Sequence, residues 1–75
     1  MAVLVALSEA GYSCFGAWCF APARLEHTRG RVPPVRLCVD CSVQDAQNAD
    51  AEGHEVTYTD QARRLLQAEG KQVIA

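Results

Sequence analysis

The pattern of apolar and polar residues predicts short strands near both ends of the chain. The first seven residues are apolar, and we expect a buried β-strand with Val3, Val5 and Leu7 on one side. Periodicity alone also permits a helix for an apolar run of this length. Residues 54–58 alternate between polar and apolar side chains and predict a second strand, and residues 72–75 predict a last short strand.

The C-terminal half also carries the signals of two short helices. Residues 42–51 suit a helix with Ser42 as its N-cap, because a serine side chain can accept a hydrogen bond from the first turn. Thr59 can cap a second helix over residues 60–69, and a glycine follows each segment as a plausible stop. The apolar residues of this second helix recur at helical spacing. They need a surface to pack on, which is either the rest of the chain or a second copy in a homodimer.

The middle of the chain is expected to consist mostly of loops. Residues 22–25 are predicted to form a single helical turn and residues 28–31 a polar loop. Pro33 and Pro34 force an extended path, because proline fixes φ and restricts the residue before it. A short strand over residues 35–37 then leads into the second pair of cysteines.

These elements predict one small α+β domain over residues 1–75, with a strand, a helix and a strand in its C-terminal segment, residues 54–75. The core of such a chain is thin, since a domain of about 60 residues buries only roughly 60% of its unfolded surface. Although 49% of the residues are hydrophobic, only one Trp, two Phe and two Tyr are present. Small domains of this kind often depend on disulfides, a metal or a partner subunit.

The four cysteines can supply such a cross-link, because their spacing is typical of two metal-binding turns. One pair has four intervening residues and the other has two, and eighteen residues separate the pairs. Structural zinc takes four tetrahedral ligands, commonly from cysteines two to four residues apart. The sequence therefore predicts a zinc-finger module over residues 12–44, of two-knuckle, treble-clef or ribbon-like form. Its structural Zn²⁺ is expected to be bound by Cys14, Cys19, Cys38 and Cys41.

Other states of the cysteines remain open from the sequence. Disulfides form in exported proteins, and cysteine can also be buried as a free thiol. A redox-active pair is a further option, although that motif normally lies in a larger βαβ unit. His27 and His54 are possible substitute ligands, but His27 lies in a charged stretch and is expected to be solvated.

Charge is distributed unevenly along the chain, which suggests two kinds of partner. The net charge is −2 and the pI is about 5.5, so general affinity for nucleic acids has no support. The acidic second half suits a basic surface on a protein partner. The arginines between the cysteine pairs suit direct contact with a nucleic acid, with Trp18 or Phe20 stacking on bases unless both are core residues. The residues predicted for partner binding are Arg24, Arg29, Arg31, Arg36, Asp45, Asp50 and Glu52.

Residues 12–44 resemble the zinc finger of the DksA/TraR family. The resemblance is carried by the two cysteine pairs, by Pro22-Ala23-Arg24-Leu25 between them, and by Pro33-Pro34-Val35-Arg36-Leu37 leading into Cys38-Val39-Asp40-Cys41. The first pair has four intervening residues where the family normally has two. The resemblance implies a finger-like fold and a transcription-related partner such as RNA polymerase. It does not imply the family's entry into the secondary channel of the polymerase, because the acidic tip residues have no counterpart here.

The expected function is binding rather than catalysis. The sequence contains no glycine-rich phosphate loop and no zinc-protease motif, and four cysteine ligands would leave no open position on a zinc ion. The N-terminal apolar run has no preceding positive charge and is interrupted by Glu9, so no export signal is predicted. We therefore expect a cytoplasmic zinc-binding regulator that binds RNA polymerase or another nucleic-acid machine. A modulator or inhibitor of a host complex, encoded by a phage or mobile element, is one version of this function.

Overall fold

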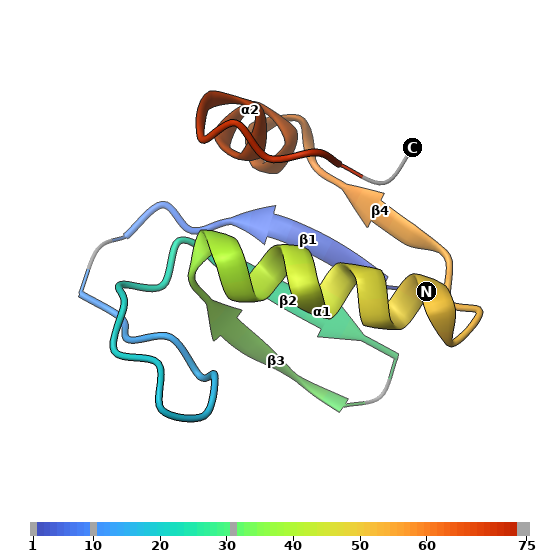
Figure 1. Cartoon of the computed structure of the whole chain (residues 1–75), viewed down its shortest axis with the longest axis horizontal. Coiled ribbons are helices and arrows are strands. Elements are labelled where there is room, and N and C mark those ends of the chain that lie inside the picture. Colours follow the sequence, from blue (N-terminus) through green and yellow to red (C-terminus); the bar gives the residue numbers. More distant parts are fainter. Residues whose placement is uncertain (1, 10, 31, 74–75) are drawn as a thin grey trace.

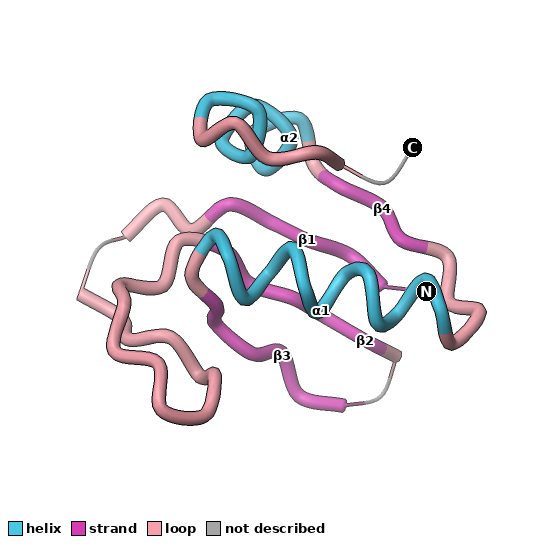
Figure 2. Tube along the Cα trace, in the orientation of Figure 1, coloured by secondary structure: helices cyan, strands magenta, loops and turns pink. Residues whose placement is uncertain are grey.

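Two helices and one four-stranded sheet make up the part of the chain that the computed structural model describes, residues 2–9, 11–30 and 32–73 (Figure 1). A long loop joins the first two strands (Figure 2). The small α+β fold expected from the sequence is therefore confirmed. In chain order the elements are β1 (Ala2–Ala6), β2 (Leu25–Arg29), β3 (Val32–Leu37), α1 (Val39–Ala51), β4 (Val56–Tyr58) and α2 (Asp60–Ala68).

The sheet has the strand order β3-β2-β1-β4, and its two faces differ in exposure. β2 pairs antiparallel with β1 and with β3, whereas β4 pairs parallel with β1. The register places Leu4 opposite both His27 and Tyr58, and all three side chains are buried on one face of the sheet. Val5 and its partner Glu26 lie on the other face, where Val5 is 38% exposed. One face is thus covered and the other is open.

The main hydrophobic cluster lies between the covered face and the two helices. α1 crosses this face (Figure 1) and buries only small side chains, Ser42, Ala46 and Ala49, so its backbone can lie close to the strands. α2 buries Ala62 and Leu66. The core contains few large side chains, as the composition led us to expect. Its buried members are Leu4, Leu25, Ala46, Tyr58, Ala62 and Leu66.

The N-terminal strand is present, but the prediction of its buried side was wrong. Ala2 and Leu4 have no exposed surface, whereas Val3 and Val5 point to the open face. Leu7 follows the end of β1. Both alternating sets of residues in this strand are apolar, so the pattern could not select between them.

The prediction for the middle of the chain missed a strand. Residues 22–25 form no helical turn; Pro22 instead pairs in an isolated bridge with Ser13, and Leu25 begins β2. Thr28 and Arg29 belong to the same strand rather than to a loop. The residues around the two prolines are extended as expected, but β3 begins before them, at Val32.

Both helices are present, and only the start of α1 differs from the prediction, while α2 ends one residue earlier than predicted, at Ala68. α2 begins after Thr59, whose side-chain oxygen accepts a hydrogen bond from the backbone N–H of Ala62 at 3.2 Å, as expected. α1 begins three residues earlier than predicted, because Cys38 and not Ser42 is its N-cap. Of the predicted strand at residues 72–75, residues 72 and 73 are not in a strand, and 74 and 75 lie outside the described residues.

Candidate metal centre

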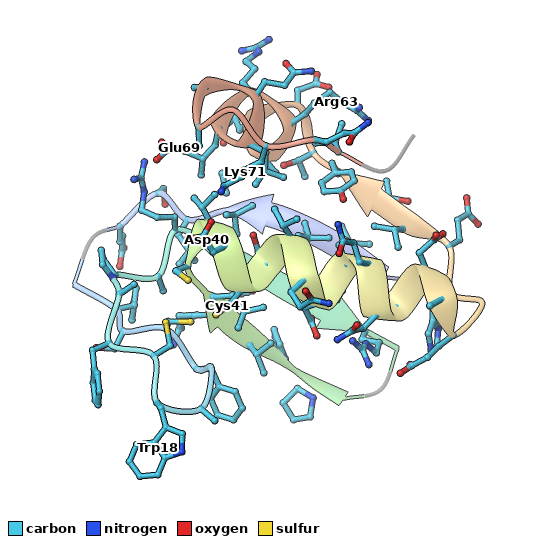
Figure 3. All side chains as sticks on the ribbon, in the orientation of Figure 1. Trp18, Asp40, Cys41, Arg63, Glu69 and Lys71 are labelled. Carbon is cyan, nitrogen blue, oxygen red and sulfur yellow. The ribbon has the colours of Figure 1, made fainter. Side chains whose placement is uncertain are left out.

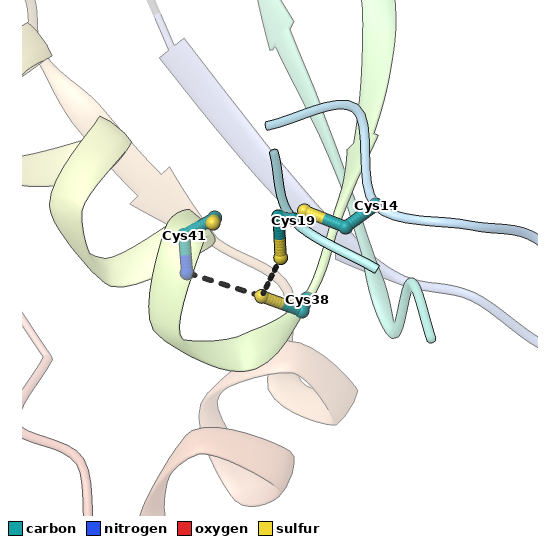
Figure 4. Close-up of side chains that lie close together, drawn as sticks. All are labelled: Cys14, Cys19, Cys38 and Cys41. Carbon is teal, nitrogen blue, oxygen red and sulfur yellow. Dashed lines mark hydrogen bonds between the residues drawn. The ribbon is translucent and has the colours of Figure 1, made fainter. Parts of the chain in front are cut away.

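Four cysteine side chains converge at one end of the sheet (Figure 4). Two come from the loop between β1 and β2, and two come from the start of α1. Their Sγ atoms all lie within 4.8 Å of one another, and all four are free thiols. A group of four sulfur ligands this close together could bind a metal ion. The convergence expected from the spacing is confirmed for Cys14, Cys19, Cys38 and Cys41.

The first pair lies in a segment that we call the knuckle loop, residues 13–22, which the bridge between Ser13 and Pro22 closes. The backbone N–H of Cys19 donates to the carbonyl of Gly16 at 3.1 Å and makes a tight turn within the loop. Gly16 has a steric role, because a Cβ at this position would lie 3.0 Å from the Sγ of Cys41. The loop backbone can therefore pass close to the sulfurs only where a side chain is absent.

Backbone N–H groups point at two of the sulfurs. The N–H of Gly16 donates to the Sγ of Cys14 at 3.3 Å, and the N–H of Cys41 donates to the Sγ of Cys38 at 3.4 Å. The latter contact is also the N-cap of α1, whose N-terminus carries partial positive charge. These dipoles stabilise negative charge on the sulfurs, which is the form in which cysteine binds a metal.

Burial, backbone hydrogen bonds and the close approach of the four sulfurs shift the pKa values of the thiols. Burial raises the pKa of Cys14, but hydrogen bonds from backbone groups and neighbouring thiols outweigh it and lower the pKa from 9.0 to about 7. Burial raises the pKa of Cys38. The neighbouring thiols Cys38 and Cys14 raise the pKa of Cys41, and burial adds to this. The lowered pKa of Cys14 favours its thiolate form, whereas the raised pKa values of Cys38 and Cys41 disfavour further thiolates unless a cation balances their charge.

A second polar cluster connects β2 to α1. His27 was expected to be solvated, but it is only 2% exposed, because it points to the covered face of the sheet. Its Nδ1–H donates to the carboxylate of Asp45, and Arg29 Nη2 donates to the other oxygen of the same carboxylate at 3.0 Å. His27 is not among the metal-site residues, so its predicted role as a substitute ligand has no support in this arrangement. Asp45 therefore has a structural contact that the sequence did not indicate.

Replacing Asp45 with alanine is expected to lower the free energy of unfolding by about 1–3 kcal/mol, because it leaves a buried imidazole without its partner. Asp50→Ala is the matched control, since Asp50 is exposed on the same helix and has no ion pair within the described chain. Its effect should stay within about 0.5 kcal/mol. Urea denaturation of both variants measures the difference, and equal effects would show that the His27 contact contributes nothing.

Most residues predicted for partner binding already have a partner within the chain. Each of the described arginines between the cysteine pairs lies within 4.0 Å of a carboxylate. The guanidinium of Arg36 also lies 4.0 Å from the centre of the Tyr12 ring. Arg31 lies outside the described residues. The ion pairs are Arg24–Glu69 at 4.0 Å, Arg29–Asp45 at 3.0 Å, Arg29–Glu52 at 3.5 Å and Arg36–Glu26 at 3.8 Å.

The large aromatic residues of the knuckle loop are exposed. The alternative in which Trp18 and Phe20 are core residues is therefore wrong. Phe15, Trp18 and Phe20 are 74%, 91% and 89% exposed. Figure 3 shows Trp18 at the outer end of the loop, pointing away from the sheet and the helices. Within the knuckle loop, each cysteine of the cluster is thus followed by an aromatic side chain that is largely exposed.

Comparison with known proteins gives no relative for this chain: no family model, no curated protein and no solved structure matches it. Neither α1 nor α2 is long and apolar enough to cross a membrane, and the described residues contain no other helix. The fold and the site together define a small α+β domain with a four-cysteine cluster.

Proposed function

We propose that this chain is a small zinc-binding interaction protein whose four cysteines hold one structural Zn²⁺. The observation that carries the proposal is the convergence of four thiols, all within 4.8 Å of one another, from two segments far apart in the sequence. Tetrahedral four-sulfur sites suit zinc or iron–sulfur centres, and pairs with this spacing are typical of structural zinc. Zinc at this position would join the knuckle loop to α1 and so supplement the thin core.

The order of elements around the cysteines favours the treble-clef form among the alternatives left open by the sequence. The knuckle loop supplies the first pair, the hairpin of β2 and β3 follows, and the second pair lies at the start of α1. On this basis the finger module extends to Ala51, the end of α1, rather than to residue 44.

The proposed zinc has a structural role and not a catalytic one. A catalytic zinc keeps one position for water or substrate, whereas four thiolates fill the tetrahedron. The function then lies in the surface that the metal holds in place.

A protein is the favoured partner. The described arginines between the cysteine pairs are already paired with carboxylates, which leaves little free positive charge for phosphates. The resemblance to DksA/TraR fingers suggests a transcription complex such as RNA polymerase, with this chain as a modulator or inhibitor. Direct binding to a nucleic acid is the second candidate, because Trp18 and Phe20 are exposed and can stack on bases. Affinity for single-stranded oligonucleotides that falls steeply as salt rises would favour it over the protein partner.

Titration of the reduced, metal-free chain with Zn²⁺ tests the metal assignment. Folding is expected to saturate at one equivalent of zinc, as followed by circular dichroism and by the dispersion of amide NMR signals. A chain that folds fully without metal and does not change on titration would refute the structural role.

Gly16→Ala is expected to weaken zinc binding by about tenfold, because overpacking typically costs about 1–3 kcal/mol and about 1.4 kcal/mol corresponds to a factor of ten. The added Cβ would lie 3.0 Å from the Sγ of Cys41, which must then move. Ala17→Ser is the matched control, since it adds one atom at the next, exposed position. Competition with a chromophoric chelator measures both affinities, and equal values would mean that Gly16 has no role at the site.

A further inference from the structure

The backbone of Trp18 has an unusual conformation for a bulky residue. Its φ is 60°, in the left-handed region, where a side chain beyond glycine is disfavoured. Among the described residues, all the others with positive φ are glycines. The indole does not compensate by packing, because it is 91% exposed. Exposed and strained positions of this kind cluster at functional sites.

The neighbourhood of Trp18 is apolar and presented outward. Phe20 and Phe15 are also largely exposed, and the knuckle loop contains no charged residue. Phe15 and Ala17 line a groove of about 560 Å³ together with Val35 and Leu37 of β3. Polar side chains, including Arg29 and Asp45, also line this groove. An aliphatic side chain of a partner can be buried in this groove while the rings contact its neighbours.

The charge around the loop favours a cationic partner. Four thiolates and one bound Zn²⁺ would together carry a charge of −2 directly beside the loop. The aromatic faces add negative quadrupole potential, and tryptophan binds cations best. Arg24, Arg29 and Arg36 each lie within 4.0 Å of a carboxylate, which offsets part of their positive charge near the loop.

We propose that Trp18, with Phe15 and Phe20 beside it, is the contact surface for an arginine or lysine of a protein partner, flanked by aliphatic residues that enter the groove. The inference rests on the proposed function, because the thiolate–zinc centre supplies the negative charge and orders the loop. On this proposal, the side chain of Trp18 contributes to binding of the partner and not to the stability of the fold.

Fluorescence of Trp18 provides the first test, because it is the single tryptophan of the chain. The zinc-loaded chain is titrated with an acetylated peptide of alternating leucine and arginine and, as the matched control, with the same peptide containing citrulline, which is neutral and nearly isosteric. We expect a saturable change in emission with the arginine peptide and at least tenfold weaker binding of the citrulline peptide. Equal binding of both peptides, or no binding of either at millimolar concentration, would overturn the proposal.

Two further probes separate this partner from other occupants of an aromatic surface. Single-stranded oligouridine and vesicles of neutral phosphatidylcholine are titrated under the same conditions. Neither is expected to change the emission of Trp18. Tighter binding of the oligonucleotide would assign the loop to base stacking, and a blue shift with vesicles would assign it to a membrane surface; either result contradicts the proposal.

Substitution of Trp18 tests the claim about strain. Trp18→Gly is expected to leave the urea midpoint equal or higher, while binding of the labelled arginine peptide, measured by fluorescence anisotropy, falls at least tenfold. Trp18→Tyr keeps an aromatic face and should retain most of the binding. A clear loss of stability in the glycine variant would mean that the indole serves the fold.

The zinc content of the same samples distinguishes the two possible failures. A sample without zinc that also fails to bind the peptide disproves the proposed function itself. A sample with one zinc per chain that fails to bind the arginine peptide disproves only the present inference.

Discussion

Replacing Cys38 with serine is expected to abolish zinc binding and to unfold the chain under conditions in which the unmodified chain is folded. Apparent binding free energies of structural zinc are about 10–16 kcal/mol in zinc-finger peptides, which equals or exceeds the whole stability of about 5–15 kcal/mol typical of native proteins. Cys38 has two roles, because it belongs to the sulfur cluster and its side chain also caps α1. Its loss therefore removes a ligand and weakens the start of the helix that carries Cys41.

Zinc content and circular dichroism of the purified variant measure this effect. Ser13→Ala is the matched control, because Ser13 is exposed directly beside Cys14 and offers no ligand to the site. It should keep the metal and the fold. If Cys38→Ser retains one zinc with unchanged affinity, the cysteine cluster is not the metal site.

Leu4→Ala is expected to lower the free energy of unfolding of the zinc-loaded chain by about 2–5 kcal/mol, the range for leucine-to-alanine changes in cores. Leu4 has no exposed surface and lies in the main cluster together with Leu25, Tyr58 and Leu66. A core with so few large side chains has little with which to fill the cavity. The variant should therefore be close to the limit of stability.

Val5→Ala is its control, because Val5 is the next residue of the same strand and faces the open side of the sheet. Its effect is expected to be about 1 kcal/mol or less, since part of its side chain is already in water. Urea denaturation at saturating zinc compares the two variants. A larger loss of unfolding free energy for Val5→Ala than for Leu4→Ala would mean that the buried face of β1 is the one predicted from the sequence, with Val5 in the core.

The parts of the fold that sequence reasoning anticipated are those with local signals. Thr59 followed by an acidic first turn marked the start of α2, and the cysteine spacing anticipated the convergence of four sulfurs. Both signals are short in range, because an N-cap and a metal-binding turn are each defined within a few residues.

The strand β2 was missed because its inward position is occupied by a histidine. Leu25 and His27 face the core while Glu26 and Thr28 face the open side, which is regular alternation. In a sequence pattern, histidine counts as a polar residue. His27 can be buried because it is hydrogen-bonded to the carboxylate of Asp45, eighteen residues further along the chain. A contact this distant has no local signal.

The knuckle loop shows the opposite error. A core position was an open alternative for Trp18 and Phe20, since large aromatic side chains usually bury much of their surface. Because two cysteines of the loop point inward to the cluster, the residues between and beside them are turned outward, and Trp18 and Phe20 are exposed. The inward direction of two cysteines in a short loop thus outweighs the general preference of aromatic residues for the interior.

Native mass spectrometry of the reduced chain, purified without added metal chelator, tests the central claim most directly. A metal ion shared by sulfurs from the knuckle loop and from α1 predicts a mass increased by one zinc ion per chain, with the bound metal lost on acidification. A mass equal to that of the bare, folded chain would contradict the account, and so would a mass lowered by four protons, which indicates two disulfides.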